Sequence, residues 1–119
     1  LAHDASTKTH LGYTKIGKIT IGDNVFVGAD ATIMPGVSIG NNSIIGTGSV
    51  VTKDVPENTV YAGNPAKFIC TLEDYLEKNK KLMQTNPVYD YSYTLGGNIT
   101  EEKKQQMLDE LQSRMGYVE

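Results

Sequence analysis

The chain has 119 residues, with 11 basic and 14 acidic side chains and a formal net charge of −3 at pH 7. This acidic balance argues against a nucleic-acid-binding protein, which would carry a clustered excess of Lys and Arg. No apolar run approaches the roughly 18 residues of a membrane span, and no signal peptide is visible. A single cysteine, Cys70, excludes an intramolecular disulfide and favours a reducing, cytoplasmic setting.

The chain opens with a polar segment over residues 1–15, LAHDASTKTHLGYTK, which contains both histidines, His3 and His10. The segment ends just before Ile16. Ile16 lies five residues before Ile21, whereas the aliphatic residues after Ile21 recur every six residues. In repeat proteins such interruptions mark inserted loops, which gather on the binding face. We expect a functional loop here, and because the first residue is Leu1 rather than Met we also expect an upstream part of the chain.

From residue 21 to residue 56 the sequence repeats every six residues. Each hexad begins with an aliphatic residue, namely Ile21, Val27, Ile33, Ile39, Ile45 and Val51. Glycine follows in four of the six hexads, and the fifth place holds a small or β-branched residue: Val25, Ala31, Val37, Ser43, Ser49 and Val55. Six residues are too few for a helical repeat and too many for strand alternation. The period therefore predicts a solenoid in which each hexad forms one face.

Three hexads would close one triangular coil, with parallel strands of successive coils about 4.8 Å apart. Ile21 then stacks under Ile39, Val27 under Ile45, and Ile33 under Val51. We expect the glycines to supply unusual backbone angles at the corners, and the small fifth residue to fit the narrow interior. Two coils bury little apolar surface, so we also expect neighbouring coils or further copies of the chain.

Residues 57–71 are predicted to cap the solenoid, because Pro56 and the Gly63-Asn64-Pro65 turn interrupt the repeat. A helix is predicted from Leu72 to about Met83, with Thr71 as N-cap and Asp74 at the capping-box position. These features divide the chain into a repeat domain, residues 1–71, and a helical extension, residues 72–119.

The extension continues with a linker over residues 84–98, in which Tyr89, Tyr91 and Tyr93 alternate as in a strand. A last helix is predicted from about Thr100 to Met115, with Gly116 as its stop. Its apolar stripe needs a partner surface, which we expect to be the solenoid or a neighbouring subunit.

Residues 2–69 resemble the hexapeptide-repeat acetyltransferases, particularly the maltose, galactoside and capsular or lipopolysaccharide sugar O-acetyltransferases. The resemblance is carried by AHDAS at 2–6, IGDNVFVGADATIMPGVSIG at 21–40, IIGTGSVVTKDV at 44–55 and AGNPAKFI at 62–69. It implies an all-β solenoid, a left-handed parallel β-helix, followed here by an α-helical extension. It also implies a homotrimer with active sites between subunits, and acetyl transfer from acetyl-CoA to a hydroxyl, usually of a sugar.

The resemblance places the catalytic histidine of the family at His3. An alcohol attacks a thioester poorly unless a base takes its proton, and histidine, with a pKa near 6.5, can serve as that base for a gain of roughly 10²- to 10⁴-fold. His10, seven residues later in the same segment, is the alternative base.

The resemblance also suggests which residues contact the cofactor. Ala29 and Thr47 match corner positions, Thr52 and Lys53 follow the GSVV sequence, and Lys67 lies in GNPAK. Lysines supply point charge to phosphates, which suits Lys53 and Lys67 to the phosphate groups of CoA.

Two other functions stay open at this point. A non-catalytic β-helix could act as a trimerisation or scaffold module. A metal enzyme of the hexapeptide carbonic anhydrase type would need three histidine ligands, whereas the chain has two histidines, so no metal is expected. The acceptor is not fixed by the sequence: a sugar is expected, and an amine is the alternative.

Overall fold

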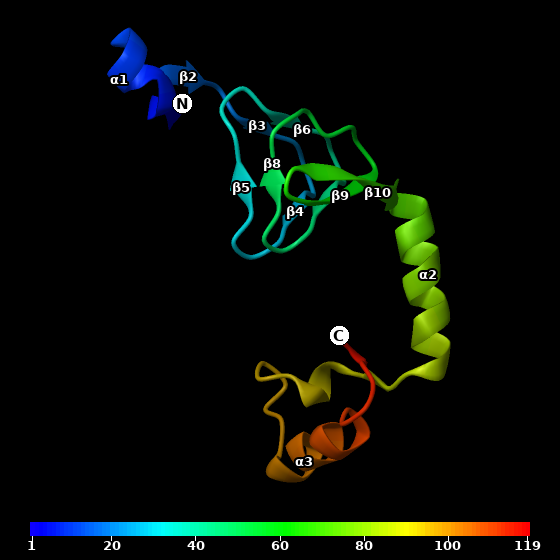
Figure 1. Ribbon diagram of the computed structural model, residues 1–119. Helices are drawn as coiled ribbons and strands as arrows, with labels where there is room; N and C mark the ends of the chain where they lie inside the picture. The colour runs from blue at the N-terminus through cyan, green and yellow to red at the C-terminus, as the bar shows by residue number, and fades with distance from the viewer. The chain divides into compact units, whose positions relative to one another are not determined.

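The computed structural model describes residues 1–119, which separate into two compact units, Leu1–Tyr75 and Leu76–Glu119. Figure 1 traces the chain through the strands of the first unit and the helix-containing second unit. No helix is long and apolar enough to cross a lipid bilayer.

Six short strands of the first unit build three separate parallel sheets (Figure 1). They are β3 (Thr20–Ile21), β4 (Phe26–Val27), β5 (Thr32–Ile33), β6 (Ser38–Ile39), β7 (Ile44–Ile45) and β8 (Val50–Val51). β3 pairs with β6, β4 with β7, and β5 with β8, so the chain returns to the same sheet after every third strand. The paired residues are Ile21 with Ile39, Val27 with Ile45, and Ile33 with Val51, which confirms the predicted stacking.

The interior of this unit consists of the first and fifth residues of the hexads. Ile39, Ile45 and Val51, together with Val37, Ser43, Ser49 and Val55, are at most 3% exposed. The Ser43 hydroxyl donates to the Gly40 carbonyl at 2.7 Å and the Ser49 hydroxyl to the Gly46 carbonyl at 2.6 Å, so both buried polar groups are satisfied. β3 and β4 are edge strands, and there Ile21 is 48% and Val27 38% exposed.

The glycines in the second place of the hexads serve a purpose that differs from the predicted one. A Cβ built on Gly28 would lie 2.5 Å from the backbone nitrogen of Thr47 in the next coil, so glycine is needed for close approach of the two backbones. Left-handed backbone occurs instead in the fourth place, at Asn24, Asp30, Gly36, Asn42 and Gly48, with φ between +54° and +86°. Asn, Asp and Gly are the residues that adopt this conformation most readily.

The cap of the repeat is a β-hairpin. β9 (Thr59–Gly63) pairs in parallel with β7, and β10 (Ala66–Thr71) pairs antiparallel with β9, so the hairpin extends the sheet of β4 and β7. Helix α2 (Leu72–Thr85) follows directly. The Asp74 amide donates to the Thr71 hydroxyl at 3.1 Å, which confirms Thr71 as the N-cap.

The first residues form a folded arm. It consists of β1 (Ala2–Asp4), the 3-10 helix η1 (Ala5–Thr7), the single-turn helix α1 (Lys8–Leu11) and β2 (Lys15–Gly17). β1 and β2 pair antiparallel with each other and make a sheet separate from the three repeat sheets.

The second unit differs from its prediction in two places. Within the predicted linker only β11 (Val88–Tyr89) is a strand, because Asp90 accepts a hydrogen bond from the Ser92 amide at 2.9 Å and starts the 3-10 helix η2 (Tyr91–Tyr93). Helix α3 (Glu101–Glu110) begins after Thr100 as predicted, and the Lys103 amide donates to the Thr100 hydroxyl at 3.2 Å.

The predicted end of the last helix is wrong, because α3 stops at Glu110 and not at Met115. The chain leaves the helix to form β12 (Tyr117–Val118), which pairs in parallel with β11. The Tyr117 amide donates to the Pro87 carbonyl at 2.9 Å. Tertiary strand pairing therefore overrides the helical pattern of residues 111–115.

Replacing Ile45 with Ala tests the stacking of the coils. Ile45 is 0% exposed and Ile44, its neighbour on the outer side of the same strand, is half-buried. Ile45→Ala should lower the free energy of unfolding by about 2–5 kcal/mol, measured from urea titrations, because it leaves a cavity in the interior. The matched variant Ile44→Ala should lose clearly less, and an equal loss in the two variants would contradict the inward orientation of the first hexad residue.

Candidate active site

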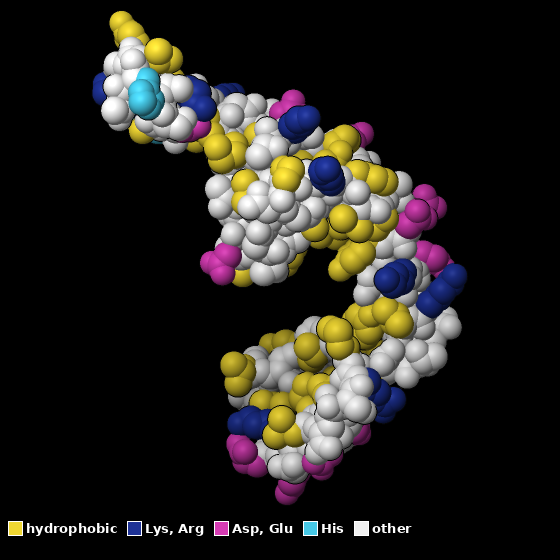
Figure 2. Space-filling view, viewed as in Figure 1, with side chains coloured by type: hydrophobic (Ala, Val, Ile, Leu, Met, Phe, Trp, Pro, Cys, Tyr) yellow, Lys and Arg dark blue, Asp and Glu magenta, His cyan; other side chains and the backbone are white.

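The arm at residues 2–17 places the proposed base. β1 and β2 pair so that His3 lies opposite Ile16. Alternation along β1 leaves Ala2 and Asp4 half-buried and His3 exposed. Figure 2 shows histidine atoms on the surface of this arm.

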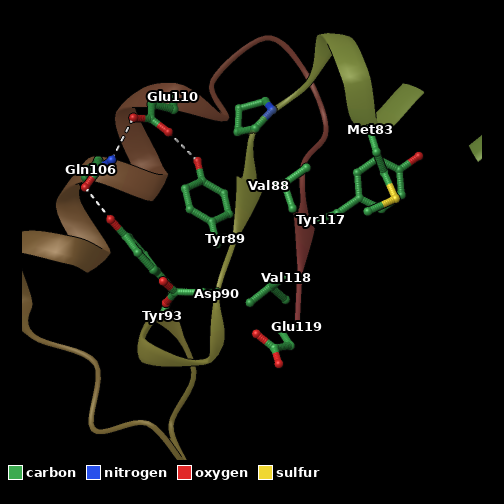
Figure 3. Close-up of a pocket in the computed structure, with 11 residues that line it drawn as sticks. Met83, Val88, Tyr89, Asp90, Tyr93, Gln106, Glu110, Tyr117, Val118 and Glu119 are labelled. Atoms are coloured by element: carbon green, nitrogen blue, oxygen red, sulfur yellow. Dashed lines mark hydrogen bonds between the residues drawn. The ribbon is translucent and has the colours of Figure 1, made fainter. Parts of the chain in front are cut away.

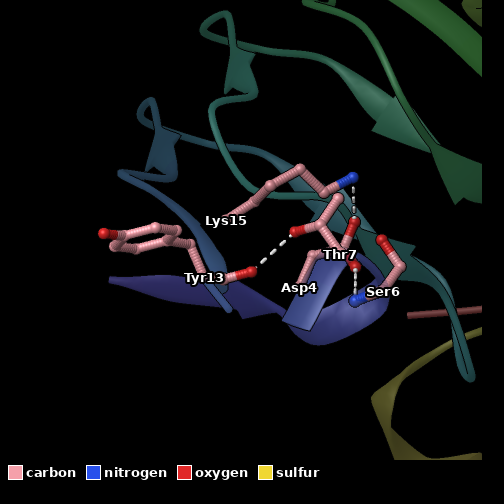
Figure 4. A network of polar contacts seen from close by, with 5 residues as sticks. All are labelled: Asp4, Ser6, Thr7, Tyr13 and Lys15. Atoms are coloured by element: carbon pink, nitrogen blue, oxygen red, sulfur yellow. Dashed lines mark hydrogen bonds and ion pairs between the residues drawn. The ribbon is translucent and has the colours of Figure 1, made fainter. Parts of the chain in front are cut away.

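Asp4 organises the arm, a role that was not predicted for it. Its Oδ2 lies 2.6 Å from the Lys15 Nζ, and its Oδ1 accepts a hydrogen bond from the Ser6 amide at 2.9 Å (Figure 4). The hydrogen bond from Lys15 and those from Ser6 hold the pKa of the Asp4 carboxyl well below its usual range. Asp followed by Ala-Ser-Thr is a helix-start signal that could have predicted this cap.

Further hydrogen bonds close the arm. The Thr7 hydroxyl donates to the Tyr13 carbonyl at 2.8 Å (Figure 4), and the Lys8 Nζ donates to the Gly12 carbonyl at 3.0 Å. Gly12 has φ +79°, which lets the chain reverse after α1. The side chains of Asp4 and Thr7 therefore hold the backbone of the predicted loop.

His3 and His10 both face solvent. His3 lies on β1 and His10 on α1, and neither imidazole makes a hydrogen bond or ion pair within the chain. The Asp4 carboxylate is bonded to Lys15 and Ser6, so it does not orient His3 by a hydrogen bond.

Two of the predicted cofactor residues come together on one corner of the repeat. Ala29 follows β4 and Thr47 follows β7, and the Gly48 amide donates to the Ala29 carbonyl at 2.8 Å. Both residues are exposed, and neither backbone N–H has an acceptor within the chain. This corner therefore presents free amide donors beside small side chains.

Of the other three, Lys67 lies on the sheet that leads to this corner, and Thr52 and Lys53 do not. Thr52 and Lys53 follow β8 at a different corner, and Lys67 lies on β10. All three are exposed, and neither lysine makes an ion pair. No hydrogen bond or ion pair joins any of the cofactor residues to His3. No group of three or more His, Cys, Asp or Glu side chains is placed to hold a metal ion.

Comparison with known proteins identifies the repeat. Residues 18–53 match the family model described as the hexapeptide repeat of succinyl-transferase. Galactoside O-acetyltransferase of Escherichia coli strain K12 is 55% identical over 56 residues, which is 47% of this chain and 28% of that protein. Residues 18–53 therefore form a hexapeptide repeat, and this segment is similar to the corresponding part of an acetyltransferase.

Two solved structures resemble the chain. A galactoside acetyltransferase in complex with coenzyme A has a TM-score of 0.55 and 42% identity, over 64% of this chain and 38% of that one. The hexapeptide-repeat acetyltransferase VCA0836 of Vibrio cholerae, complexed with acetyl-CoA, has a TM-score of 0.53 and 33% identity, over 60% of this chain and 39% of that one. The chain spans well under half the length of the curated relatives that it matches.

The match to the family model covers only part of the candidate site. Ala29, Thr47, Thr52 and Lys53 fall inside residues 18–53, whereas His3 and Lys67 fall outside. Four of the five predicted cofactor residues therefore lie in the matched stretch, and the predicted base lies in a different one.

An acid titration tests the role of Asp4 in the arm. Because the folded-state pKa of Asp4 is depressed, its bonds to Lys15 and Ser6 persist below the ordinary carboxyl pKa of about 3.9 and are lost only as the pH falls further, through the depressed value. The chemical shift of the Ser6 amide should therefore change only at a pH well below that ordinary value. Asp4→Asn should shift the Ser6 resonance at neutral pH, while Asp23→Asn should leave it in place. If the chemical shift of the Ser6 amide changed at the ordinary carboxyl pKa, the bonding of Asp4 to Lys15 and Ser6 would be contradicted.

Proposed function

We propose that the protein is an acetyl-CoA-dependent O-acetyltransferase that transfers an acetyl group directly to a hydroxyl of a sugar. The observation that carries the proposal is the stacked hexad segment, which is similar to a galactoside acetyltransferase solved with coenzyme A. On this proposal the three-sheet repeat is a left-handed parallel β-helix, the enzyme works in the cytoplasm, and the chain divides into a β-helix domain, residues 1–71, and a helical extension, residues 72–119.

The exposed corner at Ala29 and Thr47 fits acetyl-CoA. The pantetheine arm carries amide groups, and the free backbone N–H groups of both residues are suitable partners for their carbonyls. Thr52 adds a hydroxyl at a second corner. Lys53 and Lys67, exposed and without ion pairs, would hold the phosphates.

His3 is the proposed general base. Its imidazole would take the proton of the acceptor hydroxyl as that oxygen bonds to the acetyl carbon. The bond from the acetyl carbon to sulfur then breaks, and the imidazolium returns the proton to the departing thiolate. Acetyl-CoA supplies only the activated thioester. The exposed position of His3 leaves its ring accessible to an acceptor.

A homotrimer with active sites between subunits is part of the proposal. It is supported by the position of His3 on a two-stranded sheet separate from the repeat sheets, so that a second copy could bring the other site residues to it. Large apolar side chains on the repeat unit are also uncovered: Phe26 is 62%, Phe68 54% and Ile69 58% exposed. Faces of this kind are typical of interaction surfaces.

A non-catalytic trimerisation or scaffold module is the second candidate. One observation favours it: His3 has no partner within the chain to orient its ring. Catalytic histidines generally have such a partner.

Replacing the two histidines separately tests the base. His3→Ala should lower kcat by about 10²- to 10⁴-fold, because the hydroxyl loses its proton acceptor, while leaving CoA binding nearly unchanged. His10→Ala is the matched control and should retain most of the turnover. The rate of acetyl-CoA consumption measures kcat, and calorimetry measures CoA binding. A His3→Ala protein that keeps its kcat while His10→Ala loses it would reverse the assignment.

Calorimetric titration with CoA separates the enzyme from the scaffold. Lys53→Ala and Lys67→Ala should each weaken binding by roughly 10- to 150-fold, since each removes a charged contact to phosphate of about 1.5–3 kcal/mol. Lys80→Ala, on α2, should have no effect. A well-folded protein that binds no CoA would support the scaffold instead.

A further inference from the structure

The second unit contains a cavity of about 730 Å³ between α3, the paired strands β11 and β12, and the end of α2 (Figure 3). This volume lies within the range of about 300–1,000 Å³ that is usual for small-molecule sites. All the lining residues belong to Leu76–Glu119, so the proposed acetyl transfer on the repeat unit does not account for it.

One wall of the cavity is a fixed chain of hydrogen bonds (Figure 3). The Tyr93 hydroxyl donates to the Gln106 Oε1 at 3.0 Å, and the Gln106 Nε2 donates to the Glu110 Oε1 at 2.9 Å. The Tyr89 hydroxyl donates to the Glu110 Oε2 at 2.6 Å. Burial and this bond raise the pKa of Tyr89 to about 12, so its hydroxyl keeps its proton. Gln106 retains one N–H, and the Glu110 carboxylate retains lone pairs for a ligand.

A second group of acceptors lies where the two strands end. The Asp90 Oδ1 accepts from the Ser92 amide at 2.9 Å and from the Ser92 hydroxyl at 2.5 Å, and the Glu119 Oε2 accepts from the Tyr91 amide at 3.1 Å. The Asp90 Oδ2 and the Glu119 Oε1 have no partner within the chain. The lining is therefore rich in acceptors, and a matching ligand must be rich in hydrogen-bond donors.

The charges around the cavity favour a neutral ligand. No Lys or Arg lines it, which disfavours phosphates and carboxylates. A cation gains less than three carboxylates suggest, because Lys103 and Arg114, outside the lining, interact electrostatically with the Asp90 and Glu110 carboxylates. The Lys103 Nζ donates to the Ser92 hydroxyl at 2.7 Å and lies 4.9 Å from the centre of the Tyr93 ring, while the Arg114 Nε donates to the Glu110 carbonyl at 3.3 Å.

The lining also has an apolar part. Val118 pairs with Tyr89 across the strands and is 52% exposed, so its methyl groups are available to a ligand. We infer that this cavity binds a neutral saccharide unit, with hydroxyls donating to Glu110, Asp90 and Glu119 and a C–H face on Val118. This second site is independent of the proposed transferase activity.

NMR titration of the full chain tests the inference, with maltose and lactose as neutral probes and spermidine as the cationic one. At millimolar concentration the disaccharides should shift the amide resonances of Gln106, Glu110 and Val118. Gln106→Leu should weaken the binding about tenfold, since it removes one donor and disconnects the polar wall. Gln105→Leu makes the same change on the neighbouring residue, outside the cavity, and should bind as the unaltered chain does.

Glu110→Gln keeps the size of the side chain and removes its charge, so it tests the wall without opening a gap. It should also weaken disaccharide binding, because a charged acceptor becomes a neutral one. Absence of shifts with both disaccharides would overturn the inference, as would shifts with spermidine alone. Equal weakening by Gln106→Leu and Gln105→Leu would overturn it too. None of these outcomes bears on acetyl-CoA consumption, which tests the proposed function separately.

Discussion

The parallel pairing of each hexad strand with the strand eighteen residues later is the constraint on which the first unit depends. It brings Ile45 onto Val27 and Val51 onto Ile33, and it thereby builds an interior from side chains far apart in the sequence. The same pairing aligns the corners, so that the amide of Gly48, the residue after Thr47, donates to the Ala29 carbonyl. It also brings successive backbones so close at Gly28 that no side chain fits there.

The regular repeat does not hold the proposed base. His3 lies on a separate two-stranded sheet that is organised by the Asp4 carboxylate, its Lys15 ion pair and its cap on η1. The two groups of proposed site residues therefore lie on different elements. The stacked coils carry the backbone N–H groups and the lysines, and the short polar arm carries the imidazole. Such a division suits a two-substrate reaction, since the cofactor and acceptor can be held by different elements.

Much of this architecture could be predicted from the sequence, because the stacking residues recur with a fixed period. The register of Ile21 on Ile39 and the N-caps at Thr71 and Thr100 follow from such local patterns. The end of α3 could not be predicted, because the strand pairing of Tyr117 with Val88 is a long-range contact. The close approach that requires glycine at position 28 could not be predicted for a similar reason, because the atom that excludes a side chain there belongs to Thr47, in the next coil.

The central claim is that the stacked repeat and its arm transfer acetyl groups to sugar hydroxyls. The most direct measurement is the release of free CoA thiol from acetyl-CoA by the full chain, in the presence of a panel of sugars, nucleotide sugars and amines. The account predicts thiol release that depends on a sugar, with an acetyl ester as the product. Release with amines alone, or no release with any sugar from a protein that binds acetyl-CoA, would contradict it.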